Sequence, residues 1–217
     1  MKKMILSLLM VASIFSSGYA QNANQQLQAA VAKLANAEKV KDYIQLAGEF
    51  EQMANDDPGN WLPDYYAAFC NAKIGWLYQD DGEKIEPFAD KAEEHINRVL
   101  QQLDTSKQKT ELSEVYCIKS MLNRARVFVN PMTQGRKYGP AAFQYLQMAL
   151  RINPANPRAI YLDGWEKFYT PKMYGGDKKK AKELLQKAIA GLNAEQLPAN
   201  YPHWGKKEAE ELLTKLK

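Results

Sequence analysis

Few side chains in this sequence could do covalent or metal chemistry, and they lie far apart. The chain contains two histidines, His95 and His203, and two cysteines, Cys70 and Cys117. Glu94 precedes His95, but the spacing of the H-E-x-x-H motif of zinc hydrolases is absent. A catalytic thiol would need a nearby base and an electropositive pocket, and the sequence indicates neither. We therefore expect no metal site and no catalytic site on these residues.

The two cysteines leave two interpretations open. Both fall on the first helices of neighbouring helix pairs in the prediction below, so an exported chain could join Cys70 to Cys117. Free cysteines are also among the residues most often buried, and sequence does not determine the distance between two sulfur atoms. A disulfide and two buried thiols both remain open.

Three further patterns resemble sites but lack the spacing that the chemistry needs. Gly175-Gly176 precedes Asp177 and three lysines, but the lysine and hydroxyl of a phosphate-binding loop are misplaced. The turn at 55–60 lacks the D-x-D-x-D-G spacing of a calcium loop. Paired carboxylates such as Glu93-Glu94 lie on polar helix faces, where charges serve solubility. We expect no cofactor and no enzymatic activity.

The first twenty residues, 1–20, have the features of a secretory signal peptide. Lys2 and Lys3 precede an apolar run over 4–15. The small residues Gly18 and Ala20 then flank Tyr19 just before the predicted cleavage site. The mature chain, 21–217, is expected to be one exported domain, with the periplasm as its expected compartment. Without the two lysines, 27 basic residues stand against 25 acidic ones, and this balance argues against a nucleic-acid partner. No second apolar run reaches the length of a membrane span.

The stretch 153–192 predicts one complete helix–turn–helix unit. Pro157 suits the first turn of a helix, and Thr170-Pro171 ends that helix. Gly175-Gly176 allows a turn, and Asp177 suits the N-cap of a second amphipathic helix. Two amphipathic helices cannot bury both apolar faces alone, so we expect neighbouring pairs to stack on this one.

The same periodicity recurs along the chain and predicts four helix pairs, one C-terminal capping helix and no strands. An internal repeat supports the stacking, because residues about 40 positions apart match in type. The matches are Phe128, Pro131 and Gly135 with Phe168, Pro171 and Gly175, and Ala142, Leu146 and Ala149 with Ala181, Leu185 and Ala188.

This pattern resembles the tetratricopeptide repeat (TPR) family, in which small residues occur once in the first helix and twice in the second, and proline ends the unit. The matching residues are Gly164, Ala181, Ala188, Ala142, Ala149 and Pro154. Asp163 and Lys167 depart from the pattern, and residues 169–174 lengthen the turn. The resemblance implies an all-α solenoid of αα-hairpins, TPR-like, wound as a right-handed superhelix.

The resemblance also implies a binding role, because first helices of TPR-like proteins line a groove that holds a peptide or a partner helix. Our candidate ligand-binding residues are large flat or forked side chains on first helices, namely Arg124, Arg158, Tyr161 and Trp165. The spacing of Tyr161 and Trp165 equally fits a packed helix face. We expect a non-enzymatic scaffold that binds a protein or peptide in the bacterial cell envelope.

Two other functions stay open beside the scaffold. A small-molecule or glycan-binding accessory protein would use an aromatic-lined pocket, with Trp61, Tyr65, Trp76 and Trp165 as stacking platforms. An enzyme on a helical scaffold would need converging titratable groups, which the sequence hardly offers. The partner's identity, the binding face and the oligomeric state are not determined by the sequence.

Overall fold

The structure is a computed structural model that describes residues 21–216. The predicted signal peptide, 1–20, lies outside the described residues. Residues 21–216 form helices and contain no strand, which confirms the all-α prediction. The helices are 21–34, α2 (Val40–Asp56), α3 (Trp61–Leu77), α4 (Glu86–Gln102), α5 (Lys109–Val129), α6 (Pro131–Ile152), α7 (Pro157–Tyr169), α8 (Lys178–Ala194) and α9 (Lys206–Thr214), with short 3₁₀ turns η1 (Gly82–Lys84) and η2 (Lys172–Tyr174).

Helix boundaries follow local capping chemistry. Asn130 and Asn156 each accept hydrogen bonds from backbone amides of the first turn, and a proline follows each as the first helical residue. Asp177 caps α8 in the same way, its Oδ1 accepting from the amide of Lys180 at 3.0 Å. The cap at Asn156 and the cap at Asp177 confirm both predicted helix starts in 153–192.

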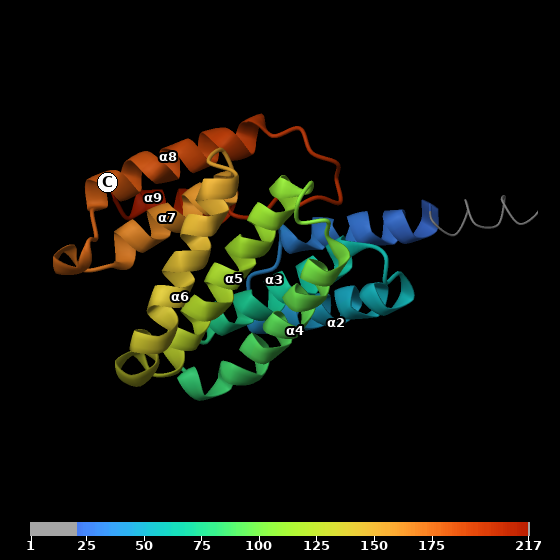
Figure 1. The fold of residues 1–217 in the computed structure, drawn as a ribbon, viewed down its shortest axis with the longest axis horizontal. Coiled ribbons are helices and arrows are strands. Elements are labelled where there is room, and N and C mark those ends of the chain that lie inside the picture. The colour runs from blue at the N-terminus through green and yellow to red at the C-terminus, as the bar shows by residue number, and fades with distance from the viewer. Residues whose placement is uncertain (1–20, 217) are drawn as a thin grey trace, which may run out of the picture.

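The helices are arranged in pairs that follow one another across the molecule in chain order (Figure 1). Helix α3 packs against α2, α4 and α5, and α5 packs against α6 and α7. Residues 21–216 therefore contain four helix pairs and the additional C-terminal helix α9, as predicted. These contacts do not establish a TPR-like right-handed superhelix.

The internal repeat is reproduced in the helices but not in the turns. The three small or apolar residues of α6, Ala142, Leu146 and Ala149, are fully buried, and so are their counterparts in α8. Gly135, however, lies inside α6, whereas Gly175 has a left-handed backbone with φ of 94° in the turn after η2. The pair formed by α5 and α6 has almost no turn between its helices, because α6 begins two residues after α5 ends.

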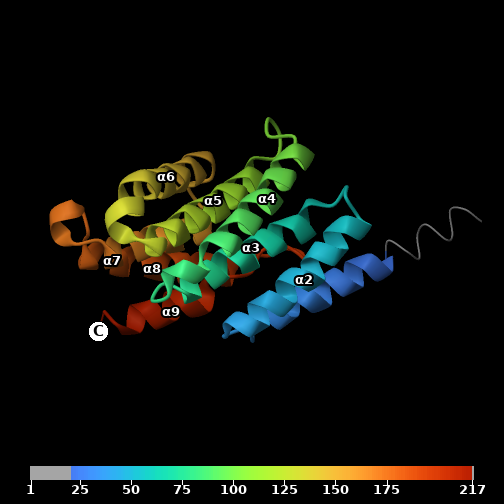
Figure 2. The ribbon, with the colours of Figure 1, turned by 90° about the horizontal axis from the view of Figure 1, so that it is seen from below.

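The segment after α8 turns back across the molecule and packs on the first helices of other pairs (Figure 2). The Trp204 ring stacks on Phe69 of α3 at 5.0 Å between centroids, and its indole N–H donates to the Tyr65 hydroxyl at 2.8 Å. Glu208 of α9 pairs with Lys73 of α3 at 2.7 Å. The chain's own C-terminal segment thus covers a face formed by α3 and α7.

Candidate ligand groove

A groove of about 1020 Å³ lies between the end of α5, the first half of α6, the end of α7 and the turn after it. Its volume is at the upper end of the range of roughly 300–1,000 Å³ usual for ligand sites. The side chains and backbone that line it include Arg124, Val127, Phe128, Pro131, Met132, Gly135, Arg136, Gly139, Pro140, Phe143, Asp163, Trp165, Glu166, Lys167, Tyr169, Thr170, Pro171, Tyr174 and Gly175.

Trp165 of α7 is the centre of an aromatic cluster at this groove. Its ring centroid lies 4.6 Å from that of Trp76 and 4.6 Å from that of Tyr169, and Phe128 meets its edge at 6.4 Å. The indole N–H of Trp76 donates to the carbonyl of Met121 at 2.8 Å, which fixes the ring behind Trp165. The aromatic wall is therefore held in place before any ligand arrives.

Apolar side chains are exposed at the groove. Of the seven large hydrophobic residues that are exposed in residues 21–216, four line it. Met132 is 88% exposed, Tyr174 73%, Phe143 50% and Tyr169 49%. Exposed apolar side chains that gather in one concave place mark a binding surface, whereas scattered ones do not.

Cationic side chains stand among these apolar groups. Arg136 is exposed on α6, and the Lys167 ammonium of α7 donates to the carbonyl of Gly175 at 3.1 Å. Arg124 pairs with Glu166 at 2.5 Å, while its Nε is buried and has no hydrogen-bond partner in the described part of the chain. Burial raises the pKa of Glu166, and the charge of Arg124 offsets this in part. The groove thus combines flat apolar surfaces with positive charge.

The turn after α7 forms one wall of the groove because two glycines hold it in shape. Gly175 has a left-handed backbone, which other residues rarely adopt. A Cβ on Gly176 would lie 1.7 Å from the carbonyl oxygen of Thr170, so only glycine fits there. This wall corresponds to the extension 169–174 that departs from the TPR pattern.

The structure places two of the four predicted binding residues at the groove and two elsewhere. Arg124 and Trp165 line it together, and the guanidinium carbon lies 5.9 Å from the Trp165 ring centroid. Tyr161 is 5% exposed and meets the edge of Trp204, with ring centroids 6.4 Å apart. Tyr161 is therefore covered by the C-terminal segment.

Arg158 is also part of the core and not of an open surface, because 3% of its side chain is exposed. Its Nε donates to the Glu114 carboxylate at 2.9 Å, and its two terminal nitrogens donate to Glu195 at 2.8 and 2.7 Å. Arginine pairs well with carboxylates, and here both carboxylates belong to the chain itself.

Sequence reasoning missed the exposed apolar residues of the groove. Of the four predicted stacking platforms only Trp165 lines it, whereas Tyr65 is fully buried. Met132, Phe143 and Tyr174 were not singled out, because exposure cannot be read from residue type. Besides Arg124 and Trp165, the lengthened turn at 169–174 was a signal in the sequence that pointed to this place.

The residues with potential covalent or metal chemistry lie away from the groove. Cys70 and Cys117 are both buried free thiols, so the structure does not contain the disulfide that the sequence left open. His95 is buried, and its Nδ1 is 2.9 Å from the Asp64 carboxylate. No cluster of three or more histidine, cysteine or acidic residues within 21–216 could hold a metal ion. None of the helices in this range is long and apolar enough to cross a bilayer.

Comparison with known proteins gives one informative match. No protein-family model matches the chain, so the resemblance to the TPR family is not confirmed, and a search of curated proteins finds no match. The solved structure of the HusA haemophore from Porphyromonas gingivalis is similar over 92% of this chain and 92% of its own, with 31% sequence identity and a TM-score of 0.76. Identity and coverage at this level show common descent and a common fold, and this chain belongs to the family of the HusA haemophore.

Proposed function

We propose that this protein binds haem, or a closely related planar tetrapyrrole, in the groove between α6 and α7. The observation that carries the proposal is the gathering of four exposed apolar side chains around the fixed Trp165 wall in a groove of about 1020 Å³. The similarity to a haemophore supports the class of ligand. Among the functions considered from sequence, small-molecule binding is thus favoured over the protein scaffold.

The chemistry of the groove suits both parts of such a ligand. The flat macrocycle would stack on aromatic rings such as Trp165 and Phe143, since aromatic surfaces prefer offset or edge contacts with other rings. The two propionate groups would pair with cations at the groove, for which Arg136 and Lys167 are available. Arg124 could join them where a ligand carboxylate competes with Glu166.

The groove also contains atoms of the types that ligate haem iron. Methionine sulfur and tyrosine oxygen are known axial ligands, and Met132, Tyr169 and Tyr174 line the groove. Neither histidine belongs to it, because His95 is buried beside Asp64 and His203 lies by a separate cleft with Trp204. A bound haem would bring its own redox-active iron, and the protein's part would be to hold and shield the ring.

A peptide-binding scaffold, the first function inferred from sequence, has less support. Its predicted site was the face of the first helices, and there Tyr161 and Arg158 contact Trp204 and Glu195 of the chain itself. An added peptide would have to displace a segment that is tied down by a buried hydrogen bond and an ion pair.

The proposal also covers the protein's location, its lack of enzymatic activity and the winding of its helix pairs. We place the protein outside the cytoplasm, on the basis of the signal-peptide pattern in 1–20 and of the haemophore relative, with the periplasm as one option. We also propose that it is a binding protein without enzymatic activity. A TPR-like superhelix stays part of the proposal, supported by the stacked pairs and the small residues at their contacts.

An absorbance titration with haem tests the proposed site. Phe143→Ser should weaken binding by about fivefold or more, because removing a stacking partner in an apolar site costs on the order of 1 kcal/mol or more. Ile44→Ser is the matched control, since Ile44 is 46% exposed and does not line the groove, whereas Phe143 is 50% exposed. Equal affinity of the two variants, or no haem binding by the wild type, would refute the proposal.

A further inference from the structure

Positive charge is concentrated in one short part of the chain. Residues 167–187 contain seven lysines against Asp177 and Glu183, a formal charge of +5. Because the whole chain carries +4, all other residues together carry −1. This segment covers the end of α7, the following turn and most of α8. Whatever binds it through charge must be anionic.

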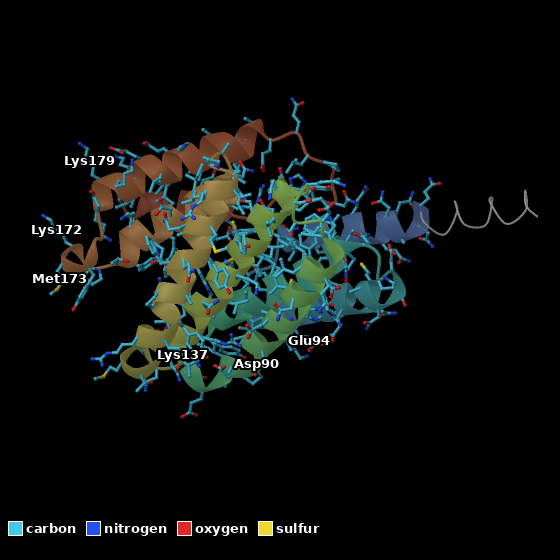
Figure 3. All side chains as sticks on the ribbon, in the orientation of Figure 1. Asp90, Glu94, Lys137, Lys172, Met173 and Lys179 are labelled. Carbon is cyan, nitrogen blue, oxygen red and sulfur yellow. The ribbon has the colours of Figure 1, made fainter. Side chains whose placement is uncertain are left out.

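Most of these lysines are available for an external partner. Lys172 and Lys179 are exposed and form no ion pair within residues 21–216, whereas the Lys178 ammonium lies over the Phe168 ring and Lys180 pairs with Glu183. They surround the turn that contains η2, and Figure 3 shows Lys172 and Lys179 projecting from this end of the molecule, away from Asp90 and Glu94 on α4. Lys172 and Lys179 therefore lie apart from the acidic residues Asp90 and Glu94.

One apolar side chain outside the ligand groove stands at the tip of the same turn. Met173 is 80% exposed and follows Lys172 directly. Figure 3 shows Met173 beside Lys172 at the outermost point of the turn. An exposed apolar side chain beside several lysines is a combination found in proteins that dock on a membrane surface.

The kind of cation favours a lipid surface over a protein. The segment 167–187 has seven lysines and no arginine, and protein interfaces are depleted in lysine and enriched in arginine. Lysines near anionic headgroups each contribute about a fivefold increase in binding. We propose that the tip Lys172–Lys179 docks on a bilayer that contains anionic lipids, with Met173 entering the headgroup region.

Sedimentation with lipid vesicles tests the docking, without haem and therefore independently of the proposed function. We expect the mature chain to bind vesicles of phosphatidylcholine mixed with phosphatidylglycerol, to release them at high salt, and not to bind phosphatidylcholine alone. The double variant Lys172→Gln/Lys179→Gln should bind about 25-fold more weakly, because two of the lysine contributions are lost.

Two further variants distinguish docking through the tip from binding by the net positive charge of the chain. Lys91→Gln/Lys137→Gln removes two exposed lysines on α4 and α6 and should bind anionic vesicles as the wild type does. Met173→Ser keeps every charge and should weaken binding, since it removes the apolar group at the tip. Equal weakening by both double variants would show binding by net charge only and would overturn the proposal. Absence of binding to anionic vesicles would do the same and would leave an acidic protein as the remaining kind of partner.

Discussion

Replacing Arg158 by methionine should destabilise the whole fold, because its guanidinium neutralises the buried carboxylate of Glu114 and also pairs with the partly exposed Glu195. Glu114 is 4% exposed and accepts from Arg158, from the Tyr65 hydroxyl at 3.0 Å and from the Asn156 amide at 2.7 Å. Without the arginine its charge would stay buried with neutral donors only. Removing one partner of a buried ion pair costs about 3–5 kcal/mol of unfolding free energy.

The loss should be visible in urea and in heat. For a chain of this size about 3–5 kcal/mol corresponds to a fall in Tm of about 10 °C. Urea unfolding followed by circular dichroism gives the free energy directly. The double variant Glu114→Gln/Arg158→Met removes both charges and should regain part of the loss, since an uncompensated buried charge is the main cost. Glu195, 18% exposed, can turn to water in either variant.

This experiment also separates the two roles considered for Arg158. A structural role predicts a large loss of stability and unchanged haem affinity of the folded fraction. A ligand-binding role predicts the reverse, with weaker binding and a stability change within about 0.5 kcal/mol, as for most surface substitutions. The second outcome would refute the reasoning about the buried network.

Three other predictions concern the core and its titratable groups. Trp204→Ala should cost about 3–5 kcal/mol in urea unfolding, because it removes the stack on Phe69 and the hydrogen bond to Tyr65; a loss below about 1 kcal/mol would mean that the C-terminal segment is only loosely attached. Burial opposes ionisation of Asp64, but the hydrogen bond with His95 and the charge of Arg98 outweigh it and lower its pKa below the ordinary 3.8. The stability from this ion is therefore present above about pH 4 and lost as pH falls through the lowered pKa, so Asp64→Asn should flatten the acid side of the stability profile, and an unchanged profile would contradict this. Burial raises the pKa of both Cys70 and Cys117, so a thiol reagent should label neither in the native protein and both in denaturant, whereas a lack of labelling in denaturant would indicate a disulfide.

The parts of the fold that sequence predicts well are those set by near neighbours in the chain. Asn156, Pro157 and Asp177 determine helix starts through their own side chains and the next few amides, so these boundaries were predictable. Gly164 was identified as the small residue of the first helix in the TPR-like pattern, and a Cβ there would lie 3.1 Å from Leu185 of α8. Periodicity likewise identified the buried alanines of α6 and α8.

The parts that sequence missed depend on residues far apart in the chain. Nothing local shows that Trp204 will stack on Phe69, 135 positions earlier, and this contact turns Tyr161 from a surface residue into a core residue. The exposure of a side chain also depends on distant parts of the chain. Phe143 and Tyr174 are exposed because α6, α7 and the turn after α7 leave a groove between them. The candidate site was therefore predicted for Arg124 and Trp165 and missed for most of its apolar lining.

The site itself can be located most directly by NMR of the mature chain during titration with a diamagnetic metalloporphyrin. If the groove between α6 and α7 binds the ring, the largest backbone amide shifts should fall in 131–143 and 165–175. Residues around the separate cleft at His203 and Trp204 should stay unchanged. Large shifts confined to that second cleft, or shifts spread evenly over the chain, would contradict the proposed site.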